Sequence, residues 1–374
     1  MTKFIHSADW QLGMTRHFLA GEAQSRFSGD RIDVVRTIGQ LAVAHECGFV
    51  VVAGDVFETN IVDRQVVVRA LDAMAATPDV TFYLLPGNHD PLDASSVFRS
   101  DTFTTNQPAN VVVLDTSEPV TIAASVELIG APWFSKRPLC DLVADACADL
   151  TDDGITRIVV GHGAVDTLSP DSANPALIQL DHLESLIEAG AIHYVALGDR
   201  HSTTGVGATG RIHYSGAPEP TDFREVDPGN ALIVDIGPNH CSVEPVKTAD
   251  WRFISHDIHL TGAADLDALD EWASSIEHRD RCIVKLGLVG QISLSEKARL
   301  DTMLDHYRSL FASVQTSARR SDLAVLPSDD DLSELQLSGF AGAALDELRQ
   351  QSAGNNGADL ANEALSLLFR LGSN

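Results

Sequence analysis

Short apolar runs alternate with segments of helical spacing along the first half of the chain. In the segment 30–46, Ile32, Val35 and Ile38 fall on one face of a helix, while the runs on either side are short enough for buried strands. Alternation of strand, helix and strand predicts an α/β core. The predicted strands are 4–7, 49–53, 80–85, 155–160 and 193–197, and the predicted helices are 30–46 and 63–76.

The remaining apolar segments predict a second sheet and a second domain, since 374 residues are too many for one ordinary core. Further strands at 111–114, 126–129, 212–215 and 232–236 fit two mixed sheets flanked by helices, a four-layered α/β sandwich. We expect this domain at 1–249 and a small α+β cap domain at 250–374. The predicted cap elements are 251–259, a helix at 265–274, 283–288, a helix at 295–310, 314–318 and helical spacing at Leu360, Ala364, Leu365, Leu368 and Leu371.

Charge and cysteine content narrow the class of protein. The formal net charge is −27, whereas proteins that bind nucleic acid through their own electrostatics are usually basic. A DNA-acting protein of this composition would need bound metals, a local basic patch or a partner subunit. No apolar stretch reaches the roughly 18 to 20 residues that span a bilayer, and the start has no signal-peptide layout. The five scattered cysteines, without CxxC pairs, predict reduced thiols of a cytoplasmic protein and no zinc site.

Five short polar motifs follow apolar runs, where a strand would end. Ligand sites collect at the carboxyl ends of strands in open α/β sheets, so these motifs are expected to share one site. They supply carboxylate, amide and imidazole groups, the ligands that two neighbouring divalent cations need. The motifs are Asp9-Trp10-Gln11, Gly54-Asp55-Val56-Phe57-Glu58, Gly87-Asn88-His89-Asp90, Gly161-His162-Gly163 and Gly198-Asp199-Arg200-His201. A two-metal phosphoester-cleaving centre is therefore the first hypothesis.

Each motif by itself also has an ordinary explanation. Asp55 could be a helix cap or turn residue, and His162 could be a solvated loop side chain. However, a carboxylate such as Asp55 can bridge two cations. Asp199 and His201, two apart in an extended segment, point the same way. Five such motifs in one chain make the ordinary explanation improbable.

The set of motifs resembles the calcineurin-like metallophosphoesterases, whose pattern is DxH, GDxxD, GNHD or GNHE, a later His, and GHxH. More narrowly, the chain is similar to the SbcD-type nuclease subunit of DNA repair. The resemblance covers roughly the first 250 residues, and the remainder fits that family's capping domain by size and element order. The segments that carry this narrower resemblance are Ser7-Ala8-Asp9-Trp10 with Leu12-Gly13, Ala53-Gly54-Asp55-Val56-Phe57, Tyr194-Val195-Ala196-Leu197-Gly198 and Tyr214-Ser215-Gly216-Ala217-Pro218-Glu219-Pro220.

The resemblance implies a role for each motif residue. His89 would be the catalytic acid beside the scissile phosphate, and Asp55 would bridge two metal ions. One ion would be held by Asp9, Gln11, Asp55 and His201, and the other by Asp55, Asn88, His162 and Asp199. Among residues near the motifs, Arg16, His17 and Arg200 are the candidates for substrate binding, although ordinary surface charge explains them about equally well.

The chain departs from the family pattern at three positions. Gln11 replaces a His, Asp199 replaces the first His of GHxH, and Glu58 replaces an Asp. Each metal position keeps one imidazole and gains oxygen ligands, which favours manganese or magnesium over zinc.

The resemblance also implies a function and partners. The predicted activity is a divalent-metal-dependent DNA exonuclease and endonuclease acting with an SbcC-like coiled-coil ATPase, and a homodimer is a further expectation. Two alternatives remain open at this point: a phosphodiesterase or phosphatase for small nucleotides, and a structural subunit whose altered ligands have cost it catalysis.

Overall fold

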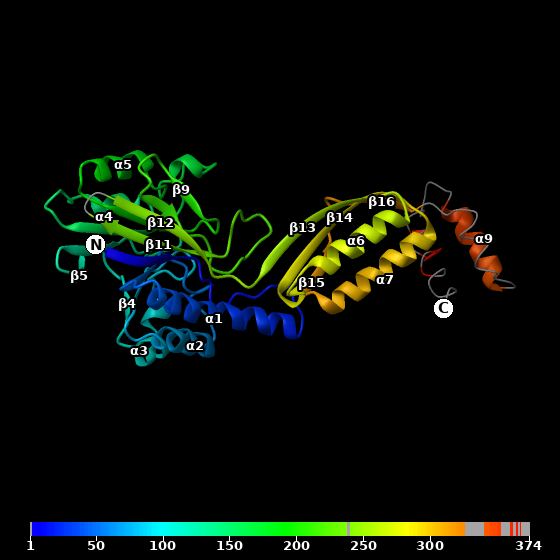
Figure 1. Cartoon of the computed structure of the whole chain (residues 1–374), viewed down its shortest axis with the longest axis horizontal. Helices are drawn as coiled ribbons and strands as arrows, with labels where there is room; N and C mark the ends of the chain where they lie inside the picture. Colours follow the sequence, from blue (N-terminus) through cyan, green and yellow to red (C-terminus); the bar gives the residue numbers. More distant parts are fainter. Residues whose placement is uncertain are drawn as a thin grey trace. The chain divides into compact units, whose positions relative to one another are not determined.

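The computed structural model describes residues 2–237, 240–325 and 340–352, together with 360–361, 364–365 and 367. The chain forms two compact units, Met1–Trp251 and Arg252–Asn374. Figure 1 shows the elements of each, coloured along the sequence. None of the described helices is long and apolar enough to cross a membrane.

The first sheet of the first unit has six strands in the order β12-β11-β1-β2-β3-β4. Strands β1 to β4 run parallel to their neighbours, and β11 pairs antiparallel with both β1 and β12. The strands are β1 (Thr2–Ser7), β2 (Phe49–Val52), β3 (Thr81–Leu84), β4 (Val111–Val113), β11 (Asn230–Gly237) and β12 (His240–Lys247).

The second sheet also has six strands, in the order β5-β6-β7-β8-β10-β9. Its four central strands are parallel, and the two edge strands are antiparallel to their neighbours. The strands are β5 (Val120–Ala123), β6 (Val126–Gly130), β7 (Thr156–His162), β8 (Tyr194–Gly198), β9 (Thr204–Val206) and β10 (Ile212–Tyr214). Both sheets are therefore mixed, as predicted.

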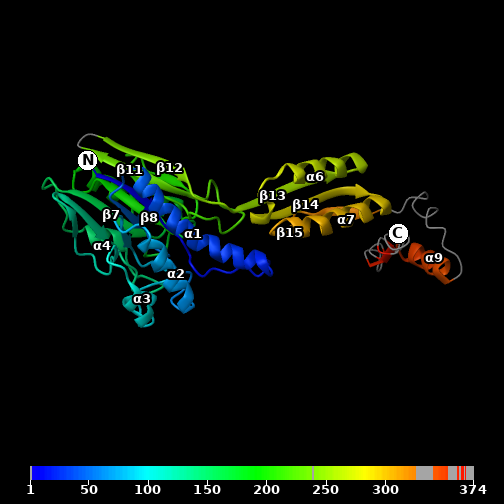
Figure 2. The same cartoon turned by 60° about the horizontal axis from the view of Figure 1, so that its bottom comes forward.

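Helices cover the outer face of each sheet. Alternate residues of β2 show how one strand serves two cores: Val50 and Val52 pack with the helices, while Val51 packs between the sheets. Figures 1 and 2 show α1 and α2 together on one side of this unit. The helices are α1 (Glu22–Ala44), α2 (Arg64–Ala75), α3 (Asp101–Asn106), α4 (Leu142–Cys147) and α5 (Leu180–Glu188), with short 3-10 turns η1 (Val97–Arg99) and η2 (Asp166–Leu168). The predicted four-layered α/β sandwich is confirmed.

The second unit has its own sheet and core. Strand β14 pairs in parallel with β13, β15 and β16. A capping box between Ser293 and Glu296 begins α7, and apolar residues of α6 and α7 pack on the sheet. The elements are β13 (Arg252–Leu260), α6 (Ala263–Ser275), η3 (Arg279–Arg281), β14 (Cys282–Ile292), α7 (Leu294–Leu310), β15 (Ser313–Thr316), β16 (Asp322–Val325) and α9 (Phe340–Ser352). Of the predicted C-terminal helical spacing, Leu368 and Leu371 lie outside the described residues.

Candidate metal centre

The polar motifs meet at the carboxyl ends of parallel strands from both sheets. The backbone amide of Asp9, after β1, donates to the carbonyl of Gly54, after β2, at 3.0 Å. In the second sheet, the amide of Gly163, after β7, donates to the carbonyl of Gly198, at the end of β8, at 3.2 Å. Close packing of these loops requires glycine at position 198, because a Cβ there would lie 1.9 Å from the carbonyl oxygen of Ala53.

Four of the predicted metal ligands have a left-handed backbone. Non-glycine residues with positive φ are uncommon, and they cluster at functional sites where the surrounding structure holds them. The φ angles are 54° for Asp9, 45° for Gln11, 54° for Asp55 and 90° for Asp199. Four such residues in loops that meet therefore mark this end of the first unit.

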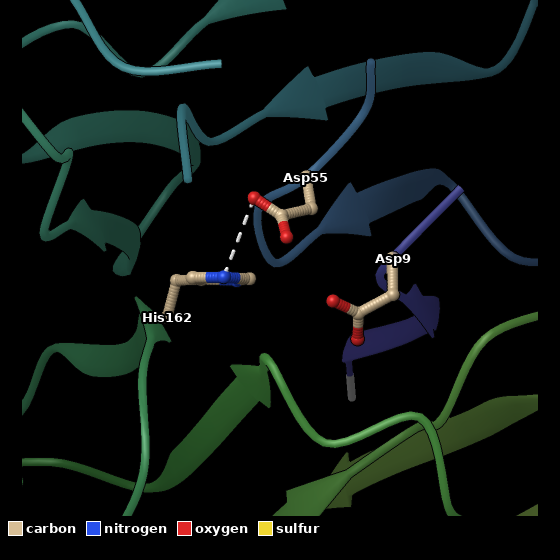
Figure 3. Close-up of side chains that lie close together, drawn as sticks. All are labelled: Asp9, Asp55 and His162. Carbon is tan, nitrogen blue, oxygen red and sulfur yellow. Dashed lines mark ion pairs between the residues drawn. The ribbon is translucent and has the colours of Figure 1, made fainter. Parts of the chain in front are cut away.

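Three side chains form the centre of the site. Figure 3 shows Asp9, Asp55 and His162 turned toward one another from three separate segments: Asp9 and Asp55 follow β1 and β2, and His162 ends β7. One potential ligand atom from each lies within 4.8 Å of the other two, and all three residues are buried. Nε2 of His162 lies 3.4 Å from Oδ1 of Asp55. Two carboxylates and an imidazole at these separations suit a hard divalent cation.

Several hydrogen-bond acceptors converge on Nε2 of His162. Its Nδ1 lies 2.8 Å from the carbonyl oxygen of Ala53, so Nδ1 carries the proton and Nε2 of the neutral ring is bare. That Nε2 lies 2.7 Å from Oδ1 of Asn88 and 3.9 Å from Oδ1 of Asp199. Such an arrangement is stable only with a proton or a cation among the acceptors. We call the half of the site that contains Asp55, Asn88, His162 and Asp199 the Asn88 side.

The pKa values of the buried groups report the same excess of acceptors. Burial alone would lower the pKa of His162, but Asp55 and the other carboxylates nearby raise it well above its usual value. Burial, with a contribution from Asp55, raises the pKa of Asp9 to about 6. Burial would also raise the pKa of Asp55, yet His162 and His89 outweigh it and lower that pKa. A bound cation would relieve the repulsion that these shifts express.

The other half of the site, which we call the Gln11 side, contains Asp9, Gln11 and His201 with the shared Asp55. Nε2 of His201 lies 3.9 Å from Oδ1 of Asp9 and 3.1 Å from Nε2 of Gln11. The backbone amide of Asp199 donates to both oxygens of Asp9, at 3.1 and 3.2 Å. Carboxylate and amide oxygens suit the same hard cations. Among the residues that the structure describes, Oε1 of Gln11 has no hydrogen-bond partner, although it is buried. A polar atom left bare at this place fits a ligand position.

His89 lies at the rim of the site, with 38% of its side chain exposed. Its Nδ1 lies 2.9 Å from the carbonyl oxygen of Glu58, and its backbone amide donates to Oδ1 of Asp55 at 2.9 Å. These bonds leave Nε2 as the free ring atom, 3.9 Å from Oδ2 of Asp55. The neighbouring Asp90 is a structural residue, because its buried carboxylate accepts from the amides of Phe57 and Gly87 and so joins two motif loops.

The structure brings together the seven predicted ligands and His89. The three candidate substrate-binding residues lie in different surroundings. Arg16 is partly buried and donates to the carbonyl oxygen of Thr221 at 2.6 Å. Arg200 is exposed next to Asp199, with its Nε 3.0 Å from the hydroxyl of Thr204. His17 is exposed, and within the described ranges no hydrogen bond or ion pair joins it to a predicted ligand.

Three residues that support the site did not stand out in the sequence. Nε1 of Trp133 donates to the carbonyl oxygen of His162 at 2.8 Å. Thr221 and Glu225 contact Nδ1 of His201 at 2.7 and 3.1 Å. None of the three belongs to a ligand motif, and only the segment 214–220, which ends just before Thr221, gave a signal near them.

A comparison with protein families finds a match over most of the first unit. The family model described as calcineurin-like phosphoesterase matches residues 2–234, well over half of the chain. No curated protein matches the chain.

Similar solved structures are distant in sequence. A dimetal phosphatase from Danio rerio is 11% identical with a TM-score of 0.42, and the match covers 66% of this chain and 96% of the phosphatase. A Plasmodium protein described as the anchor in the inner membrane complex is 13% identical with a TM-score of 0.42, covering 66% and 84%. A purple acid phosphatase from yellow lupin (Lupinus luteus) seeds is 11% identical with a TM-score of 0.36, covering 66% and 51%.

Proposed function

This chain belongs to the calcineurin-like phosphoesterase family, and we propose that within it the protein is a two-metal phosphodiesterase that cleaves DNA. The observation that carries the proposal is the convergence of oxygen atoms of Asn88 and Asp55 on Nε2 of His162. A site of this kind recruits cations, and cations supply the positive charge that an acidic chain otherwise lacks for a phosphodiester. The narrower assignment, an SbcD-type exonuclease and endonuclease in DNA repair, rests on the sequence segments that resemble that subunit.

The residues present fit two hard divalent cations, manganese or magnesium. Asp55, Asn88, His162 and Asp199 would hold one of them. Asp9, Gln11, His201 and again Asp55 would hold the other. When bound, such ions neutralise the phosphate and stabilise the entering and leaving oxygens of an in-line displacement.

The protein itself contributes a proton donor and an opening through which a substrate reaches the ligand cluster. With Nδ1 of His89 held by the Glu58 carbonyl, the proton that this ring gives to the leaving oxygen is on Nε2. The P–O bond to that oxygen breaks as a water oxygen bonds to phosphorus. Both protons of that water leave, one to solvent and one, through solvent, to restore the proton on His89. His89 and Asp199 are 38% and 40% exposed, while Asp9 is fully buried, so the ligand cluster is open on one side. An open side suits a polymer chain.

The proposal extends to partners and to the second unit. We propose that Arg252–Asn374 acts as a capping and partner-binding domain. We also propose that the protein works with an SbcC-like coiled-coil ATPase and forms a homodimer. Arg200, exposed beside Asp199, is our candidate for a contact with the DNA backbone.

The test compares substrates in the presence of manganese. Purified protein is assayed on linear duplex DNA, a single-stranded oligonucleotide and the small ester bis(p-nitrophenyl) phosphate. We expect the wild type to cleave DNA and Asp55→Ala to lose cleavage of every substrate, because Asp55 is shared by both metal positions. Asp72→Ala, which removes an exposed partner of Arg36 on α2, is the control and should keep full activity.

Each other outcome points to a different function. Cleavage of the small ester without cleavage of DNA would favour an enzyme for small nucleotides. Metal uptake without hydrolysis of any substrate would refute the proposal and favour a structural subunit. Wild-type turnover by Asp55→Ala would remove Asp55 from the centre.

A further inference from the structure

The ring of His201 is held in one protonation form by two acceptors. Nδ1 of His201 lies 2.7 Å from the Thr221 hydroxyl oxygen and 3.1 Å from Oε1 of Glu225. The Thr221 hydroxyl spends its own proton on that same carboxylate, so toward His201 it can only accept. Nδ1 therefore carries the ring proton, and Nε2, which lies 3.1 Å from the amide nitrogen of Gln11, is the acceptor atom that faces the Gln11 side.

Glu225 is itself fixed in place. Its side chain is only 6% exposed, and both of its oxygens accept from the backbone amide of Thr221, at 3.2 and 2.9 Å. A buried carboxylate with this many donors cannot swing away from the imidazole without leaving them unpaired. The contact between Glu225 and His201 is thus a built feature of the fold.

A buried arginine ties this support to the other ligands of the same side. Arg31, on α1, donates to the carbonyl oxygen of Trp10 at 3.2 and 2.9 Å, and Trp10 stands between Asp9 and Gln11. The same guanidinium donates to the carbonyl oxygens of Glu219 and Pro220, the two residues before Thr221, at 3.3 and 3.2 Å.

The Asn88 side is supported by different residues. His162 is held through Nδ1 by the carbonyl of Ala53 and through its own carbonyl by Trp133. Within the part of the chain that the structure describes, none of these hydrogen bonds involves Glu225 or Arg31. A change at Glu225 should therefore act on one half of the centre.

We propose that Glu225 is a positioning residue that makes His201 the main anchor of the Gln11 side. The inference rests on the proposed two-metal function. A carboxylate behind a ligating imidazole fixes its orientation and makes it a stronger donor. This matters more here than in a site with two imidazoles, because Gln11 can offer only a weak amide oxygen.

The first test is calorimetric titration of metal-free protein with manganese. We expect two binding steps in the wild type. Glu225→Gln should weaken one step about tenfold to a hundredfold and leave the other within about twofold. The matched control is Glu127→Gln, which removes a half-buried carboxylate that pairs with Arg157 at 3.1 Å on β6 and β7, and it should leave both steps unchanged. Trp133→Phe, which breaks the support of His162, should weaken the opposite step.

The second test needs no metal. Nitrogen-15 NMR of the metal-free protein, recorded at a pH high enough to keep the His201 ring neutral, reads which ring nitrogen carries the proton. We expect Nδ1–H in the wild type and a mixture of both tautomers in Glu225→Ala.

The outcomes separate this inference from the proposed function. Manganese uptake that Glu225→Gln leaves unchanged would overturn the inference alone. Equal weakening of both steps with a large fall in Tm would also overturn it, because Glu225 would then be a general structural residue. A wild type that takes up no manganese would refute the proposed function, and an unchanged His201 tautomer in Glu225→Ala would then overturn the inference independently.

Discussion

His6 is a buried histidine that joins the two sheets directly beneath the site. It lies on β1, and its Nε2 is 3.1 Å from the carbonyl oxygen of Leu197 on β8. A carbonyl only accepts, so Nε2 carries the proton, and Nδ1, 3.1 Å from the hydroxyl of Tyr194, accepts from it. The ring is fully satisfied in its neutral form and has no place for a second proton.

Because of this environment, the free energy of unfolding depends on pH. Burial, with a smaller contribution from His213, lowers the pKa of His6 from 6.5 to about 3. A histidine whose pKa is lowered in the folded state stabilises the protein at a pH above its pKa in the unfolded chain. That stability is lost as the pH falls below about 6.5. At pH 5, the protonated form of this histidine outnumbers the neutral form about thirtyfold in the unfolded chain, which lowers the free energy of unfolding by about 2 kcal/mol.

The assay is urea unfolding in chelator at pH 7, 6 and 5. We expect the wild type to lose about 2 kcal/mol more than His6→Gln between pH 7 and pH 5, because glutamine can make both hydrogen bonds but does not titrate. His182→Gln, at an exposed position of α5, is the control and should follow the wild type. Equal losses in the wild type and His6→Gln would refute the reasoning, since the folded protein would then protonate His6 without penalty.

Two further predictions concern the site. His89→Gln should keep both manganese-binding steps while cleaving DNA about a hundredfold to ten-thousandfold more slowly, measured by single-turnover cleavage and metal analysis; loss of metal together with activity would make His89 a ligand instead. Gln11→His should tighten one manganese step in calorimetric titration and bring the activity with zinc closer to that with manganese, because imidazole is the stronger donor for transition metals. Unchanged affinity in both steps would show that position 11 is not a ligand.

The sequence alone determined the layers of the first unit and the order of the motifs. Val-rich runs such as 49–53 are buried on both faces, and this requirement acts on the residues of one strand at a time. Local spacing was less informative where burial is sparse. The predicted helix at 30–46 is part of α1, which begins earlier, at Glu22. Residues 22–29 contain only one buried apolar residue, Phe27, and Gly21 supplies no side-chain cap, so no local signal marked the true start.

Only the tertiary structure decided which atom of each side chain faces the site. The orientation of Nε2 of His162 toward the site depends on the carbonyl of Ala53, 109 residues away. The orientation of Nε2 of His201 depends on Glu225, which lies outside every ligand motif. Motifs at strand ends can be found in the sequence because each strand and its loop are contiguous. The partners that fix protonation and orientation come from other strands and loops, and folding alone brings them within hydrogen-bonding distance.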